Sequence, residues 1–152
     1  MSQVIESRHQ EDLEKQLLRA KELMDVVTLD YKRKLKQVHG PLTQTRMARV
    51  LGVSQAAVAK ALQRAASVPD AVADFKAASP YEVCQRYAAG LIGREEVIRE
   101  LVAWPYPSAP EINEFGELES NTAGTFTDVE NAVSFGLIDD LIYEEVFNQL
   151  TA

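Results

Sequence analysis

The residues with the clearest chemical potential lie between positions 43 and 64, where amide, hydroxyl and basic side chains recur at helical spacing. A Gln amide can pair with an adenine edge, a Lys ammonium can contact guanine or a phosphate, and a small Ala side chain can approach a thymine methyl group. If residues 54–66 form a helix, its outward face collects the candidates for contacts with bases. These are Ser54, Gln55, Ala56, Ala59 and Lys60.

A second set of side chains could contact the sugar–phosphate backbone of a duplex. Hydroxyl and amide groups at the start of a helix can bind phosphate with help from the helix dipole, and basic side chains can pair with phosphate charge. The candidates are Thr43, Gln44, Thr45, Arg46, Arg49 and Arg64, together with Lys32, Arg33, Lys34 and Lys36 of the run YKRKLK.

The formal net charge of −7 opposes DNA binding, but the charge is unevenly distributed. Residues 31–64 contain eight basic side chains, and no acidic residue lies between Asp30 and Asp70. Residues 65–152 contain sixteen acidic and four basic side chains. Because the local field governs contact with phosphates, the basic block can bind DNA within an otherwise acidic chain.

Two short helices are expected to position these side chains, over residues 43–51 and 54–66. Thr43 and Ser54 are suited to be N-caps, since their hydroxyls can accept from backbone N–H groups of the first turn. Gly52 is suited to the sharp turn between the helices because it can adopt a positive φ. A further helix is expected over residues 69–77.

The small side chain of Ala48 would let the two helices cross closely. The expected shared core consists of Met47, Leu51, Val53, Val58 and Leu62. With this order of small, apolar and Gly positions, the stretch QTRMARVLGVSQAAVAKAL (44–62) resembles the helix-turn-helix of the phage repressor and Cro class. The resemblance covers about 20 of 152 residues. It implies that helix 54–66 reads the major groove. The turn is also similar to those of partition-type DNA-binding proteins.

Residues 3–38 contain no Pro or Gly and predict one long helix, about 50 Å in length. HGP at residues 39–41 ends it. Its apolar residues recur in steps of three or four, which is nearly a heptad seam and favours pairing with a second copy. The alternative is that the helix folds back over its own domain. The seam consists of Leu13, Leu17, Ala20, Met24, Val27, Tyr31, Leu35 and Val38.

An internal repeat follows, in which residues 82–102 align without gaps to residues 128–148. Each copy predicts a helix, a GLI turn and a second helix, unless GLI recurs by chance. Gly90 and Gly136 end the first helices, and Gly93 and Asp139 begin the second ones. Capping boxes are expected at Ser79–Glu82 and Thr127–Glu130. The expected apolar positions are Val83, Tyr87, Leu91, Ile92, Val97 and Leu101 in the first copy, and Val129, Val133, Leu137, Ile138, Tyr143 and Phe147 in the second.

Residues 104–124 join the two copies and contain three prolines and four acidic residues. Such a segment is typical of an extended linker, but an acidic strap that wraps a partner protein is the alternative. Three aromatic side chains, Trp104, Tyr106 and Phe115, are expected to be exposed and are the candidates for contact with a partner.

Nothing in the sequence predicts an enzyme. The chain lacks a P-loop, a dinucleotide-binding glycine pattern, HExxH and any Cys/His cluster, so neither a cofactor nor a metal is expected. Its single cysteine, Cys84, lies among apolar repeat residues and is expected in the core. Because there is also no signal peptide and no apolar span, we expect a soluble cytoplasmic protein without membrane contact.

The expected fold is all-α, with a long N-terminal helix (1–40), a helix-turn-helix domain (41–78) and an acidic C-terminal domain of two hairpins (79–102 and 127–150). The leading hypothesis is a dimeric, repressor-like regulator that reads a palindromic duplex with two helices about 34 Å apart. One alternative is an antitoxin-like protein whose acidic half neutralises a basic partner. Another is a partition or nucleoid-associated adaptor that binds DNA without regulating transcription.

Overall fold

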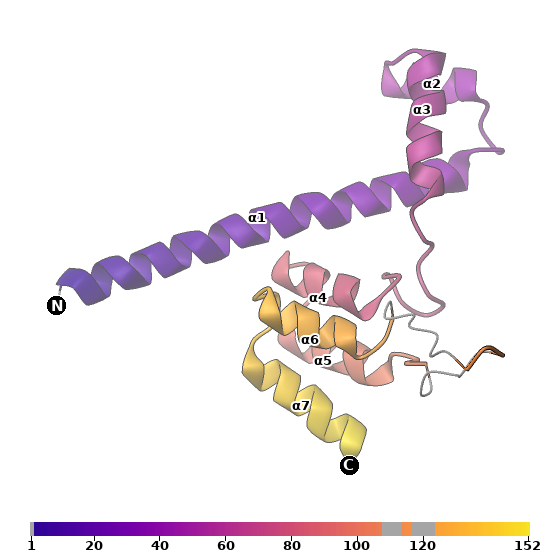
Figure 1. The fold of residues 1–152 in the computed structure, drawn as a ribbon. Helices are drawn as coiled ribbons and strands as arrows, with labels where there is room; N and C mark the ends of the chain where they lie inside the picture. The colour runs from indigo at the N-terminus through magenta and orange to yellow at the C-terminus, as the bar shows by residue number, and fades with distance from the viewer. Residues whose placement is uncertain (1, 108–113, 117–123) are drawn as a thin grey trace. The chain divides into compact units, whose positions relative to one another are not determined.

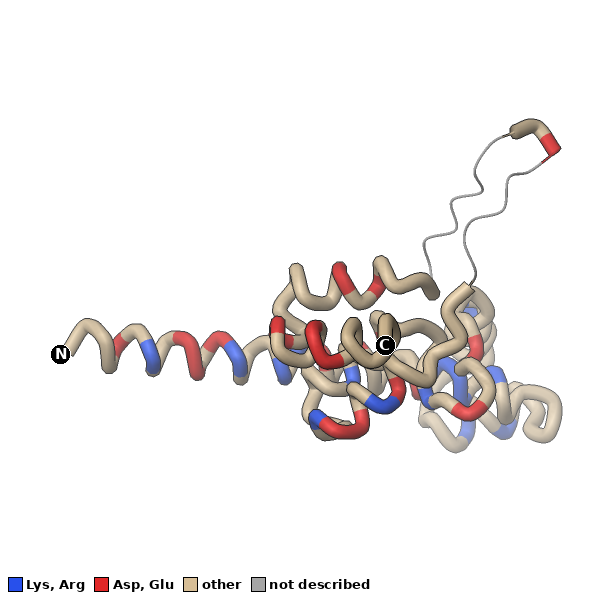
Figure 2. The backbone as a smooth tube through the Cα atoms, turned by 90° about the horizontal axis from the view of Figure 1, so that it is seen from below, with Lys and Arg blue, Asp and Glu red and all other residues tan. Residues whose placement is uncertain are grey.

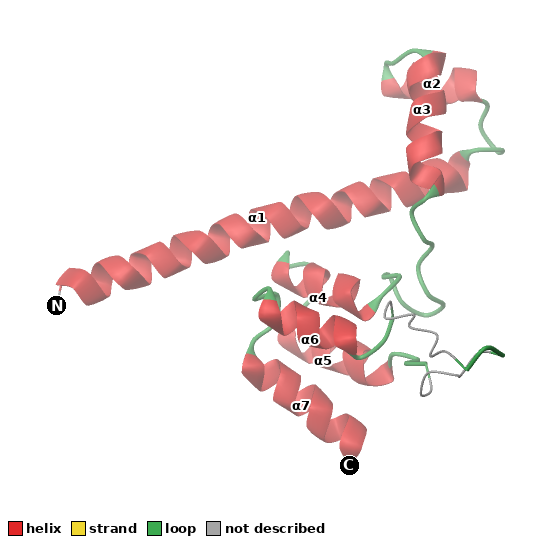
Figure 3. Ribbon diagram, in the orientation of Figure 1, coloured by secondary structure: helices red, strands yellow, loops and turns green. Residues whose placement is uncertain are grey.

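The structure is a computed structural model that describes residues 2–107, 114–116 and 124–152 (Figure 1). Within these residues the chain forms seven α-helices and no strand, which confirms the all-α prediction (Figure 3). None of these helices is both long enough and apolar enough to cross a membrane. The helices are α1 (Ser2–Val38), α2 (Gln44–Leu51), α3 (Gln55–Ala66), α4 (Pro80–Ala88), α5 (Arg94–Ala103), α6 (Thr127–Ser134) and α7 (Asp140–Thr151).

The chain divides into two compact units. The small unit is Met24–Asp70, and the large unit combines Met1–Leu23 with Ala71–Ala152. Helix α1 therefore contributes to both units, rather than forming a part of the molecule by itself. Its unbroken length of 37 residues follows from the absence of Pro and Gly, and agrees with the expected helix.

The small unit has a compact apolar core at the end of α1 and between α2 and α3. The prediction of Met47 and Val58 as core residues is confirmed, and Leu62 packs against them. The prediction is wrong for Leu51 and Val53, which are 37% and 46% exposed. The five buried residues of this core are Leu35, Met47, Ala48, Val58 and Ala65.

The large unit contains the duplicated hairpins. Helices α4 and α5 form one hairpin and α6 and α7 the other, with α4 packed on α6 and α5 packed on α7. Gly90 and Gly136 adopt φ values of 80° and 75° where the first helix of each hairpin ends, which confirms both expected helix stops. Each hairpin covers the apolar face of the other, so the repeat forms one shared core.

The two hairpins differ in the face that their second helix buries. In α5 the buried residues include Val97 and Leu101, as expected, but α7 buries Ile142 and Val146. The aligned Phe147 is exposed instead, so this member of the apolar set does not belong to the buried core. A shift of one position turns a helix by about 100°, so the gapless alignment predicts the hairpin correctly but not the buried face of α7. Leu91, a member of the apolar set of the first copy, is exposed as well.

Of the two expected capping boxes, the one at Ser79–Glu82 is present in part and the one at Thr127–Glu130 is not formed. The Ser79 hydroxyl accepts from the Glu82 N–H at 3.1 Å, while the Glu82 carboxylate accepts from the Ala78 N–H. The prediction for Thr127 is wrong, because α6 already includes this residue and has no side-chain cap. The Asp128 carboxylate accepts from Gly124 N–H at 3.0 Å instead, which stabilises the turn before the helix.

The expected helix over residues 69–77 is not formed. Asp74 has a φ of 71°, in the left-handed region, and the Val72 N–H donates to the Ala77 carbonyl at 2.9 Å across a turn. A non-glycine residue with positive φ cannot continue a right-handed helix. The turn instead directs Val72 and Phe75 into the core of the large unit.

The expected exposure of Trp104 is wrong, because this side chain is only 5% exposed and packs on Phe75 with ring centroids 4.6 Å apart. Tyr106 is half-buried, and its hydroxyl donates to the Leu101 carbonyl at 2.7 Å. Phe115 is exposed, as expected. The linker residues Pro110, Glu111, Glu117 and Glu119 lie outside the described residues.

Candidate nucleic-acid interface

Helices α2 and α3 are joined by a tight turn whose geometry follows from local sequence. The Thr43 hydroxyl accepts from the Arg46 N–H at 3.2 Å and the Ser54 hydroxyl accepts from the Ala57 N–H at 3.1 Å, which confirms both expected N-caps. Gly52 has a φ of 67° and ends α2, as expected. These three residues fix where each helix begins and where the chain reverses.

The packing of α2 on α3 leaves one face of α3 exposed. Ala48 and Val58 are buried between the helices, and the small volume of Ala48 permits their close crossing. The structure therefore brings the five base-contact candidates together on one exposed surface, which we call the α3 face. It consists of Ser54, Gln55, Ala56, Ala59 and Lys60.

The amide side chain of Gln55 is attached to α2. Its Nε2 donates a hydrogen bond to the hydroxyl of Thr45, so the start of α3 is linked to the start of α2. This bond uses one amide donor and leaves the Gln55 carbonyl oxygen and the second N–H for a ligand. Sequence spacing alone gave no sign of this pair.

Most of the expected phosphate-contact residues of α2 and α3 lie at the surface. Arg46, Arg49 and Arg64 are exposed, as are Thr43 and Thr45, while Gln44 is half-buried. In the preceding basic run, Lys32 is half-buried, and Lys34 donates to the Gln37 side chain at 2.7 Å.

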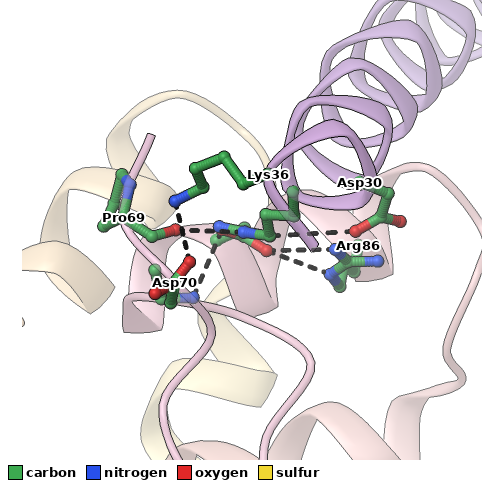
Figure 4. A network of polar contacts seen from close by, with 8 residues as sticks. Asp30, Lys36, Pro69, Asp70 and Arg86 are labelled. Atoms are coloured by element: carbon green, nitrogen blue, oxygen red, sulfur yellow. Dashed lines mark hydrogen bonds and ion pairs between the residues drawn. The ribbon is translucent and has the colours of Figure 1, made fainter. Parts of the chain in front are cut away.

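Two members of the basic run bind the segment that follows α3 (Figure 4). The Lys36 Nζ lies 2.7 Å from the Asp70 carboxylate, and Lys36 also donates to the Val68 carbonyl. Arg33 Nε donates to the Pro69 carbonyl at 3.0 Å. The hydrogen bond and charge of Lys36 lower the pKa of Asp70 below its usual value of 3.8. Lys36 and Arg33 therefore hold the end of the small unit in place, in addition to adding positive charge.

A groove of about 680 Å³ in the small unit includes part of the α3 face, because Ala56, Ala59 and Lys60 line it. It contains His39, which is not among the residues predicted from the sequence to contact DNA. Its place directly after the basic run was the signal that could have identified it. The groove is lined by Lys36, His39, Gln44, Ala56, Ala59, Lys60, Leu62, Gln63 and Ala66.

Cys84 is fully buried in the core of the large unit, as expected. Burial, with a smaller effect from the negative charge of Asp128, raises the pKa of its thiol to about 12. Because the thiolate is the reactive form of cysteine, Cys84 is unsuited to nucleophilic chemistry at neutral pH.

Comparisons with known proteins give no family for this chain. No protein-family model matches it, and no significant match was found among curated proteins or solved structures. A functional assignment must therefore come from the geometry and chemistry of the α3 face and its surroundings.

Proposed function

We propose that the chain is a sequence-specific DNA-binding protein that reads the major groove with α3. The observation that carries this proposal is the α3 face itself. It presents an amide, a hydroxyl, an ammonium and two small alanines on one exposed helix surface, held by a capped helix pair. An α-helix fits the major groove, and these groups match the donors, acceptors and methyl groups displayed there.

The charge around the α3 face supports contact with a phosphate backbone. Arg46, Arg49 and Arg64 are exposed on α2 and α3, and no acidic residue occurs between Asp30 and Asp70. Because phosphate contacts supply most of the affinity and fix the register, these arginines would position α3 for base contacts. The groove lined by Ala59 and Lys60 also contains His39, which becomes a further candidate for contact with the DNA backbone.

The finer proposal is a dimeric, repressor-like regulator in the cytoplasm. Two copies would present two reading helices to a two-fold symmetric site, and the paired contacts would raise the affinity despite the acidic large unit. The antitoxin-like alternative relied on three exposed aromatic residues for its partner contact. Trp104 is buried, which removes one of them and makes this alternative weaker.

The proposal is tested by fluorescence anisotropy with duplexes selected from a random library. The wild-type chain should bind the selected duplex at least 10³ times more tightly than random duplex at physiological salt, the lower end for specific DNA-binding proteins. Replacing Lys60 by Ala should reduce this ratio. Replacing Lys76, a basic residue of the large unit, by Ala is the matched control and should leave it unchanged. Equal affinity for both duplexes would contradict the proposal.

A further inference from the structure

Helix α1 carries apolar side chains on two opposite sides. One side is buried in this chain, with Leu18 packed on the core of the large unit and Glu22 accepting from the Gln85 amide at 3.1 Å. The other side is exposed and also carries large apolar side chains. Its large residues are between 48% and 73% exposed, and they are Leu13, Leu17, Met24, Val27 and Tyr31.

The exposed side has the spacing of a coiled-coil seam. From Leu13 to Tyr31, counting Ala20, the steps are 4, 3, 4, 3 and 4 residues, which is the heptad pattern. At about 100° per residue, this seam lies about half a turn from Leu18 and Glu22. The next residues of the expected seam, Leu35 and Val38, pack in the core of the small unit instead. The exposed part of the seam therefore consists of Leu13, Leu17, Ala20, Met24, Val27 and Tyr31.

We propose that this seam pairs with the same seam of a second copy, and that the two α1 helices run antiparallel with their midpoint at residue 22. This inference rests on the proposed function in one respect, namely that the DNA-binding protein is a homodimer. Beyond that, it identifies the surface through which the two copies pair and the relative direction of their α1 helices.

The side-chain volumes along the seam favour the antiparallel direction. About a midpoint at residue 22, Ala20 faces the partner's Met24, Leu17 faces the partner's Val27, and Leu13 faces the partner's Tyr31. Ala20, the smallest residue of the seam, is thus matched with the long side chain of Met24. In a parallel pair Ala20 would face itself and leave a gap, while Tyr31 would crowd its copy. Because cores are close-packed, the antiparallel layers fill the interface more evenly.

The charges of α1 favour the same direction. Residues 6–14 contain four acidic side chains and one basic, whereas residues 32–36 contain four basic side chains and no acidic one. Figure 2 shows the acidic and basic positions, in red and blue, along the N-terminal part of α1. An antiparallel pair places the acidic end beside the basic run of the partner. A parallel pair would place the two basic runs together and the two acidic ends together, which is unfavourable within a screening length of about 10 Å.

The antiparallel arrangement has a geometric consequence for DNA binding. Val38 lies sixteen residues beyond the midpoint in each helix, so the two α1 ends would be about 48 Å apart at a rise of 1.5 Å per residue. The two helix-turn-helix segments would then lie at opposite ends of the paired helices rather than side by side.

Disulfide trapping in the full-length chain tests the helix direction. Leu13→Cys and Tyr31→Cys chains, distinguished by an affinity tag, are oxidised separately and as a mixture. The native Cys84 is buried, and the wild-type chain is the control for its reactivity. We expect cross-linked dimers in the mixture and few in either variant alone. Equal cross-linking of each variant alone would indicate a parallel pair, and no cross-linking in any sample would indicate no pairing; either result would overturn the proposal.

Sedimentation of a second pair of variants tests the surface. Leu17→Glu places a charge in the seam and should convert the dimer to a monomer. Gln16→Glu adds the same charge beside the seam and should leave the dimer intact. A wild-type monomer, or a Leu17→Glu variant that stays dimeric, would overturn this proposal. If the same protein still binds the selected duplex more tightly than random duplex, either result leaves the DNA-binding proposal unchanged. If the wild-type chain is a dimer but binds both duplexes equally, only the proposed function is contradicted.

Discussion

The side-chain amide of Gln55, the first residue of α3, donates a hydrogen bond to the hydroxyl of Thr45, the second residue of α2. The bond fixes the direction of a side chain that would otherwise sample several rotamers at an exposed helix start. An amide oriented in this way loses less conformational freedom on binding. Gln55 is therefore the base-contact candidate with the most defined geometry.

We predict that Gln55→Ala reduces discrimination at one base pair by about 1–3 kcal/mol, because the bidentate amide contact is lost. Thr45→Val removes the hydroxyl at similar volume and should give a smaller loss at the same base pair, since Gln55 is present but no longer held. Affinities for a panel of single-base-pair variants of the selected site measure both effects. Gln3→Ala, on the exposed start of α1, is the control. A uniform loss over all base pairs would show that Gln55 does not read sequence.

Arg49→Ala is expected to weaken binding to selected and random duplex alike. One fewer phosphate contact should reduce the slope of log affinity against log salt by about 1. Binding titrations at several salt concentrations measure this slope. Arg99→Ala makes the same change of charge in the large unit and should leave the slope nearly unchanged. If the two variants give the same slope, general charge rather than a contact of Arg49 determines the affinity.

The buried ion pair of the large unit gives a prediction of stability. Arg86 Nη2 lies 3.1 Å from the Glu82 carboxylate, and both side chains are buried. Arg86→Met removes this ion-pair partner from the buried Glu82 carboxylate and should lower the free energy of unfolding of this unit by about 3–5 kcal/mol. Urea unfolding followed by fluorescence of Trp104, the single tryptophan of the chain, reports on the same core.

The control for Arg86 is Arg99→Met, which removes an exposed partner of Glu96 and should cost about 0–1 kcal/mol. Replacing both Glu82 and Arg86 by Met should recover much of the stability, because neither charge is then buried without its partner. If Arg86→Met and Arg99→Met unfold at the same urea concentration, the Glu82–Arg86 pair does not stabilise the large unit as proposed.

The Lys36–Asp70 pair predicts how the stability of the small unit depends on pH. Because the folded chain lowers the pKa of Asp70, the ionised carboxylate contributes stability above its usual pKa of 3.8, and this contribution is lost as the pH falls through the lower, folded-state value. Asp70→Asn should therefore be less stable than wild type at pH 7, with a difference that shrinks in acid. Far-UV circular dichroism melts across this pH range measure the difference. A difference independent of pH would exclude the carboxylate charge as its cause.

The parts of the fold that depend on local chemistry were predictable from the sequence. The caps at Thr43 and Ser54 and the turn at Gly52 follow from hydrogen bonding and backbone freedom within a few residues, and the structure has all three. The length of α1 follows equally from the absence of helix-breaking residues. The side chains of the α3 face could be predicted to share one surface, because helical periodicity alone determines which side chains lie on the same face of a helix.

The features that depend on distant packing were not predictable. Trp104 lies in a Pro-rich segment typical of a linker, but its large apolar surface is buried by Phe75 from a remote turn. Leu51 and Val53 are exposed, whereas Leu35 of α1 is buried in the core of the small unit. The attachment of Gln55 to Thr45 depends on the crossing of α2 and α3, which spacing along the chain does not determine.

The most direct test of the central claim is selection of duplexes from a random library by the full-length wild-type chain, beside a Gln55→Ala/Lys60→Ala variant of the α3 face. We expect the wild type to enrich a two-fold symmetric sequence and the variant to lose that enrichment while keeping weak, salt-sensitive binding. Enrichment of no sequence by the wild type, or the same sequence from both proteins, would contradict the claim that α3 reads DNA.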